Sequence, residues 1–340
     1  MHGFVIRLGW LRSVFVGCSL IHMYGKCLRV DDAALVFDEM PDRNTVCVNA
    51  LLSGYVEAKK WREGLELVRN MNGLNLDCDS LTLSGALRAC AGLPAMDLGR
   101  QVHGFVIRRV SDVVCDVHLQ SLLIEMYGKC GLVGKARQVF EKLGFEQGGE
   151  NEKDVVLWTS MLGAYGRNGD FEEVINLFRV MLIEGTRPDG ISFLTVISAC
   201  GHSGQVELGM EYFESMSRDF GLVHDPEHYS CVIDLLSRAG ELDKAWKLVC
   251  EMPHVESINH TISLWGSLLS ACYECGNVEL GKLAAQKALE LEPQNVGIYL
   301  LLSNIYAKNG MWDAIEQLRE VMNERGVKKD IGRSWVDLST

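Results

Sequence analysis

The hexapeptide His-Gly-Phe-Val-Ile-Arg occurs at residues 2–7 and again at 103–108. Met-Tyr-Gly-Lys-Cys likewise occurs at 23–27 and 126–130, and Leu-Arg-Ala-Cys at 87–90 has a counterpart, Ile-Ser-Ala-Cys, at 197–200. The members of each pair stand roughly a hundred residues apart, so a long block is repeated along the chain. A repeating sequence folds as an array of similar structural units, each of which packs mainly on its neighbours.

A shorter repeat of about 34 residues lies inside the long block. Its second half carries apolar residues at positions i, i+3, i+4 and i+7, as in 33–40, 136–143, 174–181 and 245–252, which predicts one apolar stripe along a helix. We therefore predict an all-α fold, a right-handed α-solenoid of helix-turn-helix repeats. The repeat starts are placed at Val14, Thr45, Ser80, Val117, Val155, Gly190, Pro226, Ile262 and Val296.

Glycines recur near the boundary between the two predicted helices of a repeat. We expect them to end the first helix in the left-handed conformation that glycine adopts without strain. They are Gly25, Gly128, Gly169, Gly204, Gly240, Gly276 and Gly310.

Composition limits the class of function. The net charge of −12 argues against a broad basic nucleic-acid surface but not against a local one. No apolar run is long enough to span a bilayer. Twelve cysteines are present, and several recur at equivalent repeat positions, in Tyr-Gly-Lys-Cys and in Ala-Cys. This recurrence indicates small buried residues and unpaired thiols in a reducing compartment.

Several motifs resemble one repeat family. Val-Asn-Ala-Leu-Leu-Ser-Gly-Tyr (48–55) and Arg-Pro-Asp (187–189) are similar to the pentatricopeptide repeat pattern of plant proteins. The repeat lengths cycle among about 31, 35 and 36 residues, which resembles the alternation of P, L and S motifs in its PLS subfamily. Leu-Trp-Gly-Ser-Leu-Leu-Ser-Ala-Cys (264–272) and Tyr-Leu-Leu-Leu-Ser-Asn-Ile-Tyr (299–306) resemble its E motifs, and 331–337 resembles the segment that follows them.

The resemblance implies a division of the chain into a partial L-type repeat at 1–13, pentatricopeptide repeats at 14–261, E-type repeats at 262–329 and a tail at 330–340. Met1 aligns with Val102, in the middle of a second helix, so the chain is expected to begin inside a repeat. No transit peptide is visible, and no C-terminal deaminase domain is expected. Localisation in a mitochondrion or chloroplast is implied by the family alone.

The resemblance also implies how the array recognises single-stranded RNA. In this family the fifth and last residues of a repeat contact one base, and an apolar second residue wedges between bases. The wedges here are Phe15, Val46 and Val156. The base-reading pairs are Cys18 with Asn44, Asn49 with Asp79, Ser84 with Asp116, Ser121 with Asp154, Thr159 with Asp189, and Leu194 with Asp225, followed by Ser230 without an assigned partner.

In the family, Asn with Asp favours uridine, and Ser or Thr with Asp favours guanosine. The implied target therefore reads, from 5′ to 3′, an unassigned base, U, a weak position, G, G and two weak positions. The implied role is site recognition for cytidine-to-uridine editing of organellar RNA. Editing-complex proteins, including a deaminase supplied in trans, would be recruited through the E-type repeats.

An alternative stays open, because Asn, Thr or Asp near the start of a helix is also an ordinary N-cap. A tetratricopeptide-type protein-binding scaffold without an RNA code is consistent with the net charge of −12.

Two segments partly resemble the signature of zinc-dependent deaminases. His254-Val255-Glu256 and Cys272-Tyr273-Glu274-Cys275 partly match it, but Ala271 stands where the signature has proline. We therefore predict no catalytic residue, no metal site and no cofactor.

Overall fold

The computed structural model describes residues 2–7, 9–10, 13–109, 116–142, 154–251 and 258–327. These residues form helices joined by short turns, with no strand among them. No helix in the described ranges is both long and apolar enough to cross a membrane. His254, Glu256 and the 331–337 segment lie outside the described residues.

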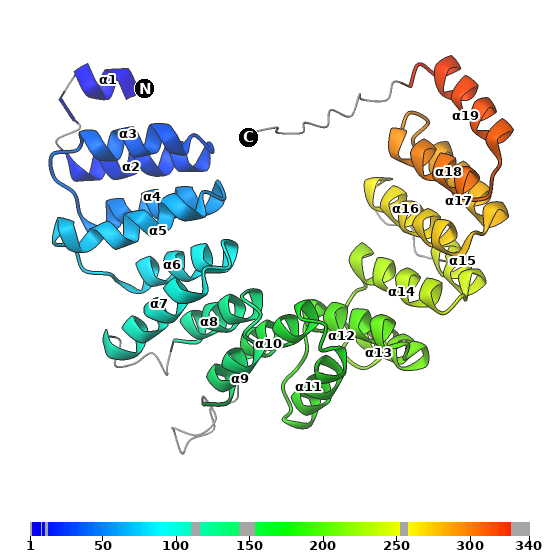
Figure 1. Ribbon diagram of the computed structural model, residues 1–340, viewed down its shortest axis with the longest axis horizontal. Coiled ribbons are helices and arrows are strands. Elements are labelled where there is room, and N and C mark those ends of the chain that lie inside the picture. The colour runs from blue at the N-terminus through cyan, green and yellow to red at the C-terminus, as the bar shows by residue number, and fades with distance from the viewer. Residues whose placement is uncertain are drawn as a thin grey trace, which may run out of the picture. The chain divides into compact units, whose positions relative to one another are not determined.

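The chain divides into two compact bodies, an N-terminal body at Met1–Arg187 and a C-terminal body at Pro188–Thr340. In the N-terminal body α2, α4, α6, α8 and α10 are the first helices of successive repeats, and each packs on the next (Figure 1). The second helices α3, α5, α7 and α9 each pack on the first helix of the following repeat. The helices are α1 (His2–Arg7), α2 (Val14–Lys26), α3 (Val30–Glu39), α4 (Thr45–Glu57), α5 (Trp61–Asn70), α6 (Ser80–Gly92), α7 (Met96–Arg109), α8 (Val117–Lys129), α9 (Val133–Lys142), α10 (Val155–Arg167) and α11 (Phe171–Ile183), with a 3-10 turn η2 (Met71–Leu74) after α5.

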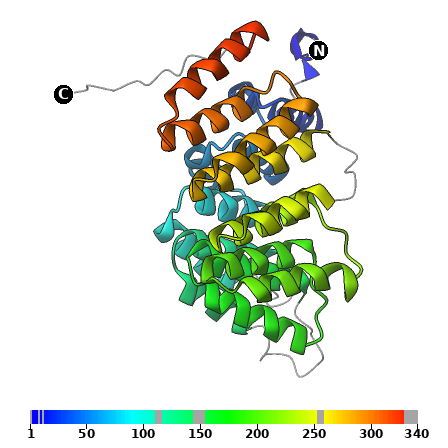
Figure 2. The same cartoon turned by 90° about the vertical axis from the view of Figure 1, so that its right-hand side faces the viewer.

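The C-terminal body repeats the same arrangement. Its first helices α12, α14, α16 and α18 pack in succession, and the run from α12 to α19 can be followed in Figure 2 from green to red. The helices are α12 (Gly190–Ser203), α13 (Val206–Arg218), α14 (Pro226–Arg238), α15 (Leu242–Glu251), α16 (Ile258–Cys275), α17 (Val278–Leu291), α18 (Val296–Lys308) and α19 (Trp312–Glu324). The predicted all-α solenoid fold of helix-turn-helix repeats is confirmed.

The predicted apolar stripes form the core between the helices. On α3, Ala33 and Val36 are fully buried and Phe37 nearly so, while the acidic residues of the same helix face outward. α16 begins at Ile258, four residues before the predicted repeat start at Ile262.

The expected role of the boundary glycines is wrong for two of them. Gly169, Gly204, Gly240, Gly276 and Gly310 have positive φ angles, but Gly25 and Gly128 lie inside helices. Their role is close approach between neighbouring first helices. A Cβ atom at Gly25 would lie 3.2 Å from Gly54 Cα, and one at Gly128 would lie 2.7 Å from Ala164 Cβ. At these two positions glycine is required because the helix backbones nearly touch.

The interpretation of the cysteines needs two corrections. Cys18 and Cys47 form a disulfide instead of remaining unpaired, because α2 and α4 place them opposite each other. The Ala-Cys residues Cys90 and Cys272 are buried as predicted, and burial raises the pKa of each to about 12, so both remain thiols. Cys27, which ends the first Tyr-Gly-Lys-Cys, is exposed, because it lies just beyond α2 and turns toward solvent.

Candidate nucleic-acid interface

The predicted pair Asn49 and Asp79 is brought into direct contact. Asn49 lies in the second turn of α4, and Asp79 is the N-cap of α6, which packs beside α4. The Asn49 amide nitrogen Nδ2 donates to both Asp79 carboxylate oxygens at 3.0 Å. The fifth and last residues of this repeat therefore meet between α4 and the N-terminus of α6.

Thr82 completes this small network. Its backbone N–H donates to Asp79 Oδ1 at 2.8 Å, and its hydroxyl lies 2.7 Å from Asn49 Oδ1 and 2.9 Å from Asp79 Oδ1. Partial burial alone would raise the pKa of Asp79. The hydrogen bonds from Thr82 and Asn49 outweigh it, so the pKa lies below its ordinary value of 3.8. Asp79 is therefore a carboxylate at neutral pH and holds the Asn49 amide in a fixed orientation.

Asp79→Ala is expected to destabilise the protein by about 1 kcal/mol at pH 7, because the α6 N-cap is lost. A carboxyl group whose pKa is lower in the folded than in the unfolded state stabilises the folded protein at pH values above its unfolded-state pKa. This stabilisation is lost as the pH falls through the pKa of the folded state. The melting-temperature difference between wild type and variant should therefore shrink at acidic pH. Asp154→Ala is the matched control, since Asp154 precedes α10 without a side-chain capping bond. Equal losses in the two variants would contradict the capping role of Asp79.

The other predicted last residues also sit at helix N-termini. Asn44 Oδ1 accepts from Cys47 N–H at 3.0 Å, Asp116 Oδ1 from Leu119 N–H at 3.1 Å and Asp189 Oδ1 from Ser192 N–H at 2.8 Å. At Asp225 it is the backbone N–H that donates, to His228 Nδ1 at 3.1 Å. Asn44, Asp116 and Asp189 therefore cap helices with their side chains, as Asp79 does. Of these three, Asn44 also lies beside its fifth residue, with Oδ1 3.9 Å from Cys18 Sγ.

The hydroxyl-bearing fifth residues behave differently from Asn49. Ser84 and Ser121 are nearly buried, and their hydroxyls donate to the backbone oxygens of Ser80 and His118, each at 2.8 Å. The Thr159 hydroxyl lies 3.0 Å from Val155 O. Such bonds to the preceding turn compete with contacts to a ligand. Asp116 is within 3.5 Å of Ser80 Oγ rather than of its predicted partner Ser84. Leu194 is half-buried in α12.

A row of exposed apolar side chains marks the second position of the repeats. The exposed fractions are 87% for Phe15, 62% for Val46 and 44% for Val156, the three predicted wedges. Leu81 (70%) and Ile191 (63%) occupy the same position in their repeats and were missed, although their place after Ser80 and Gly190 would have identified them. Large apolar residues at one exposed repeat position offer apolar contacts for bases.

A second row consists of basic residues that the sequence analysis did not identify. The thirteenth residue of a repeat, in the last turn of the first helix, is basic in six repeats. This recurrence in the sequence could have identified the row. Such residues complement the helix dipole. Lys26 pairs with Glu57 at 2.6 Å, and Arg238 pairs with Asp234 at 2.7 Å, so part of the row is neutralised within the protein. The row consists of Lys26, Lys129, Arg167, His202, Arg238 and Lys308.

The C-terminal body has a polar hollow between α14 and α16, with a volume of about 660 Å³. The predicted residue Ser230 lines it, together with Arg238 from the basic row and Ser267, whose hydroxyl lies 3.4 Å from that of Ser230. One concavity thus joins a predicted base-reading position to a cation.

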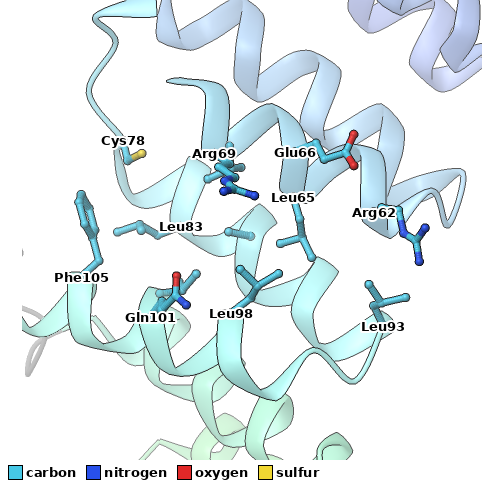
Figure 3. Close-up of a pocket in the computed structure, with 13 residues that line it drawn as sticks. Arg62, Leu65, Glu66, Arg69, Cys78, Leu83, Leu93, Leu98, Gln101 and Phe105 are labelled. Carbon is cyan, nitrogen blue, oxygen red and sulfur yellow. The ribbon is translucent and has the colours of Figure 1, made fainter. Parts of the chain in front are cut away.

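A separate cavity of about 740 Å³ opens among α5, α6 and α7 (Figure 3). Leu65, Leu83 and Leu98 project toward it, with Arg62 and Arg69 of α5 at its edge. None of the predicted base-reading residues lines this cavity. The cavity is therefore distinct from the positions of the predicted base-reading residues.

The described residues give no support to the zinc-deaminase signature. Nowhere within them do three or more His, Cys, Asp or Glu side chains gather as metal ligands. Cys272 is fully buried, whereas Cys275 is exposed and lies 3.5 Å from Ser237 O.

Comparison with known proteins identifies the repeats. Models described as a PPR repeat match residues 18–45, 46–76, 121–144, 191–219 and 227–254, and a PPR repeat family model matches 153–202. An E motif model matches 275–337. Together the repeat models alone cover more than half of the chain.

Similar curated proteins come from Arabidopsis thaliana. Pentatricopeptide repeat-containing protein At3g57430, chloroplastic, is 36% identical over 99% of this chain and 38% of its own length. The chloroplastic protein CRR2 is 37% identical, with coverage of 99% and 50%, and the mitochondrial protein At1g06140 is 37% identical, with coverage of 99% and 58%. The chain thus spans about half the length, or less, of the first relatives it matches.

Among solved structures, the crystal structure of the pentatricopeptide repeat protein PPR10 from maize has a TM-score of 0.56. It is 18% identical and covers 92% of this chain and 49% of that one, a likeness of fold. The repeat matches, the E motif and the relatives agree with the arrangement of helices, and the chain belongs to the pentatricopeptide repeat family.

Proposed function

We propose that the protein is a sequence-specific adaptor for single-stranded RNA and not itself an enzyme. The observation that carries the proposal is the set of exposed apolar side chains, beginning with Phe15 at 87% exposure, at the second position of five repeats. An exposed position on a solvated helix surface does not itself favour an apolar residue, so five such residues at equivalent positions call for a binding role. Bases stacked between neighbouring wedges would remove this surface from water.

Recognition of a base would rest on the polar residues next to the wedges. At the second repeat Asn49 would accept from uracil N3–H through Oδ1 and donate to a uracil carbonyl through its remaining Nδ2 hydrogen. The Thr82 hydroxyl can turn from Asn49 Oδ1 to Asp79 Oδ1, which lies 2.9 Å away. Asn49 Oδ1 would then be free to accept from uracil while Thr82 keeps a hydrogen-bond acceptor. The other pairs proposed to face bases are Cys18 with Asn44, Ser84 with Asp116, Ser121 with Asp154, and Thr159 with Asp189, and Ser230 lines its polar hollow.

The basic row is proposed to contact phosphates. The intramolecular ion pairs of Lys26 and Arg238 would be exchanged for phosphate contacts, so RNA affinity should fall with rising salt. Within each body the residues of this row would supply local positive charge in a chain whose net charge is −12.

The finer role proposed is site recognition for cytidine-to-uridine editing in a mitochondrion or chloroplast, by a PLS-subfamily, E-type protein. The match to the E motif and the similarity to chloroplastic and mitochondrial proteins support this role. The division into pentatricopeptide repeats at 14–261 and E-type repeats at 262–329 belongs to the same proposal. The deaminase would be supplied in trans, with editing-complex proteins binding the E-type repeats.

Replacement of two wedges tests the RNA proposal. The double variant Phe15→Ser, Val46→Ser should bind RNA at least about tenfold more weakly, because each loses a stacking surface. Its melting temperature should stay near that of wild type, since both side chains are exposed. Leu35→Ser is the control: Leu35 is 61% exposed but lies on the second helix α3. Equal binding by wild type and the double variant would remove the wedges from RNA recognition.

The cavity among α5, α6 and α7 favours a second candidate function, a protein-binding scaffold without an RNA code. Its leucines and its two arginines suit an amphipathic partner better than a base. Leu98→Glu would then abolish partner binding, while the double wedge variant would leave it unchanged. RNA binding that survives Leu98→Glu would assign the two surfaces to separate roles.

A further inference from the structure

The Cys18–Cys47 disulfide joins the first two repeats of the N-terminal body. Cys18 lies on α2 and Cys47 on α4, with their Cα atoms 4.9 Å apart. Cys47 is fully buried between the helices, whereas Cys18 is only partly buried. Cys27, Cys130, Cys250 and Cys275 remain free thiols. Among the cysteines that the structure describes, Cys18 and Cys47 alone are linked, across one inter-repeat contact.

The same contact in the next repeat shows what the disulfide replaces. There the fifth residue of one repeat, Asn49, meets the third residue of the following repeat, Thr82, through a hydrogen bond of 2.7 Å. Cys18 and Cys47 hold the equivalent fifth and third positions one repeat earlier. A covalent bond therefore stands where the second repeat has an exchangeable hydrogen bond.

The oxidation state also decides whether the fifth residue has a hydrogen to donate. Cys18 Sγ lies 3.9 Å from Asn44 Oδ1, the last residue of its repeat. Within the disulfide this sulfur carries no hydrogen. After reduction the thiol can donate to Asn44 or to a base edge, since an S–H group is a weak donor. Asn44 Oδ1 accepts from Cys47 N–H as well, so the amide stays beside both cysteines in either state.

We propose that Cys18–Cys47 is a redox-modification site that controls base reading by the first complete repeat. In the oxidised form the repeat has no donor at its fifth position and accepts any base. In the reduced form the Cys18 thiol and Asn44 form a base-reading pair, as Asn49 and Asp79 do next to it. The inference rests on the proposed RNA-binding function and assigns a regulator to one of its positions.

The chemistry is thiol–disulfide exchange with a low-molecular-weight thiol such as glutathione. A glutathione thiolate attacks Cys18 Sγ, the more accessible sulfur, and the S–S bond breaks with release of the Cys47 thiolate, which takes up a proton. A second glutathione thiolate attacks the mixed disulfide at the glutathione sulfur and releases the Cys18 thiolate, which is protonated in turn. Two glutathione molecules supply the two electrons and leave as one glutathione disulfide. The reverse sequence, driven by glutathione disulfide, restores the cross-link.

The test combines mass spectrometry with RNA binding on the same protein. The full chain is equilibrated in reduced or oxidised glutathione, free thiols are alkylated, and the link between residues 18 and 47 is quantified. Four RNAs are then titrated that carry U opposite the Asn49 repeat and differ only in the base on its 5′ side. We expect reduced protein to distinguish the four by about 3–10-fold, the gain from one modest hydrogen bond. Oxidised protein should bind all four within about twofold, as expected once that bond is lost.

Variants separate this proposal from general effects of oxidation. Cys47→Ser cannot form the 18–47 link, so protein shown by mass spectrometry to carry no glutathione adduct on Cys18 should bind as reduced protein does under both conditions. Cys27→Ser removes an exposed thiol and should retain the full redox response. A redox response in Cys47→Ser equal to that of wild type would overturn the proposal, as would identical selectivity of cross-linked and reduced wild type. Failure to prefer U opposite Asn49 in either state would instead contradict the proposed function itself, and the regulator with it.

Discussion

Gly128→Val is expected to destabilise the N-terminal body severely. A Cβ atom at Gly128 would lie 2.7 Å from Ala164 Cβ and 3.1 Å from Ala164 Cα, so α8 and α10 would have to separate. No rotation of a side chain can relieve this contact, because the obstructing atoms are Cα and Cβ of Ala164, which are fixed by the backbone of α10. We expect a loss of about 3 kcal/mol or more, the upper end for overpacking a tight interior. Thermal unfolding followed by circular dichroism should show the midpoint lowered by roughly 6–12 °C.

The control for this variant is Gly134→Val. Gly134 lies on α9 in the same body, is exposed, and has no atom within 4 Å of a new Cβ. Its replacement should change stability by less than about 0.5 kcal/mol, as is usual for surface positions. If both variants melted like wild type, the backbone contact between α8 and α10 would be wrong, and with it the spacing of the first helices.

Asn49→Thr is expected to move the preferred base of the second repeat from U to G. The amide that pairs with uracil is lost, while Asp79 stays at the repeat's last position to act with the new hydroxyl. Loss of a well-placed base contact costs about 1–3 kcal/mol, so affinity for the U-containing RNA should fall about tenfold or more. Affinity for the same RNA with G in place of U should rise. Titrations of both proteins against both RNAs give the exchange of preference as a ratio of four dissociation constants.

Asn176→Thr is the matched control for the base exchange. Asn176 is an exposed asparagine on the second helix α11, so the same substitution there should leave both affinities unchanged. Circular dichroism should show that Asn49→Thr remains folded, because Asp79 keeps its capping bond to Thr82 N–H. An unchanged U preference in folded Asn49→Thr would remove Asn49 from base reading.

The repeat pattern carried most of the fold, because the same apolar stripe and turn recur every 34 residues or so. The repeat pattern did not predict features that depend on contacts between repeats. The roles of Gly25 and Gly128 follow from how closely two helix backbones approach, and the Cys18–Cys47 link follows from two repeats placing sulfur atoms face to face. Neither distance is encoded in the sequence of a single repeat.

The candidate site shows the same limit. The pairing of Asn49 with Asp79 agrees with their positions in the repeat, because this fifth residue lies beside the N-cap of the next first helix. The burial of Ser84 and Ser121 did not follow, since a short hydroxyl that bonds its own helix looks the same in sequence as one that faces a ligand. Leu81 and Ile191, by contrast, were predictable from the wedge position alone.

The most direct test of sequence-specific RNA binding is a titration of the wild-type chain, at stated salt, with a short single-stranded RNA of the predicted order. That order places U opposite the Asn49 repeat and G opposite the Ser121 and Thr159 repeats, and a scrambled RNA of equal length and composition is the comparison. We predict tighter binding of the ordered RNA, with the advantage reduced when the U alone is replaced. Equal binding of both RNAs, weakening together as salt rises, would show only charge attraction to phosphates and would contradict base reading by this array.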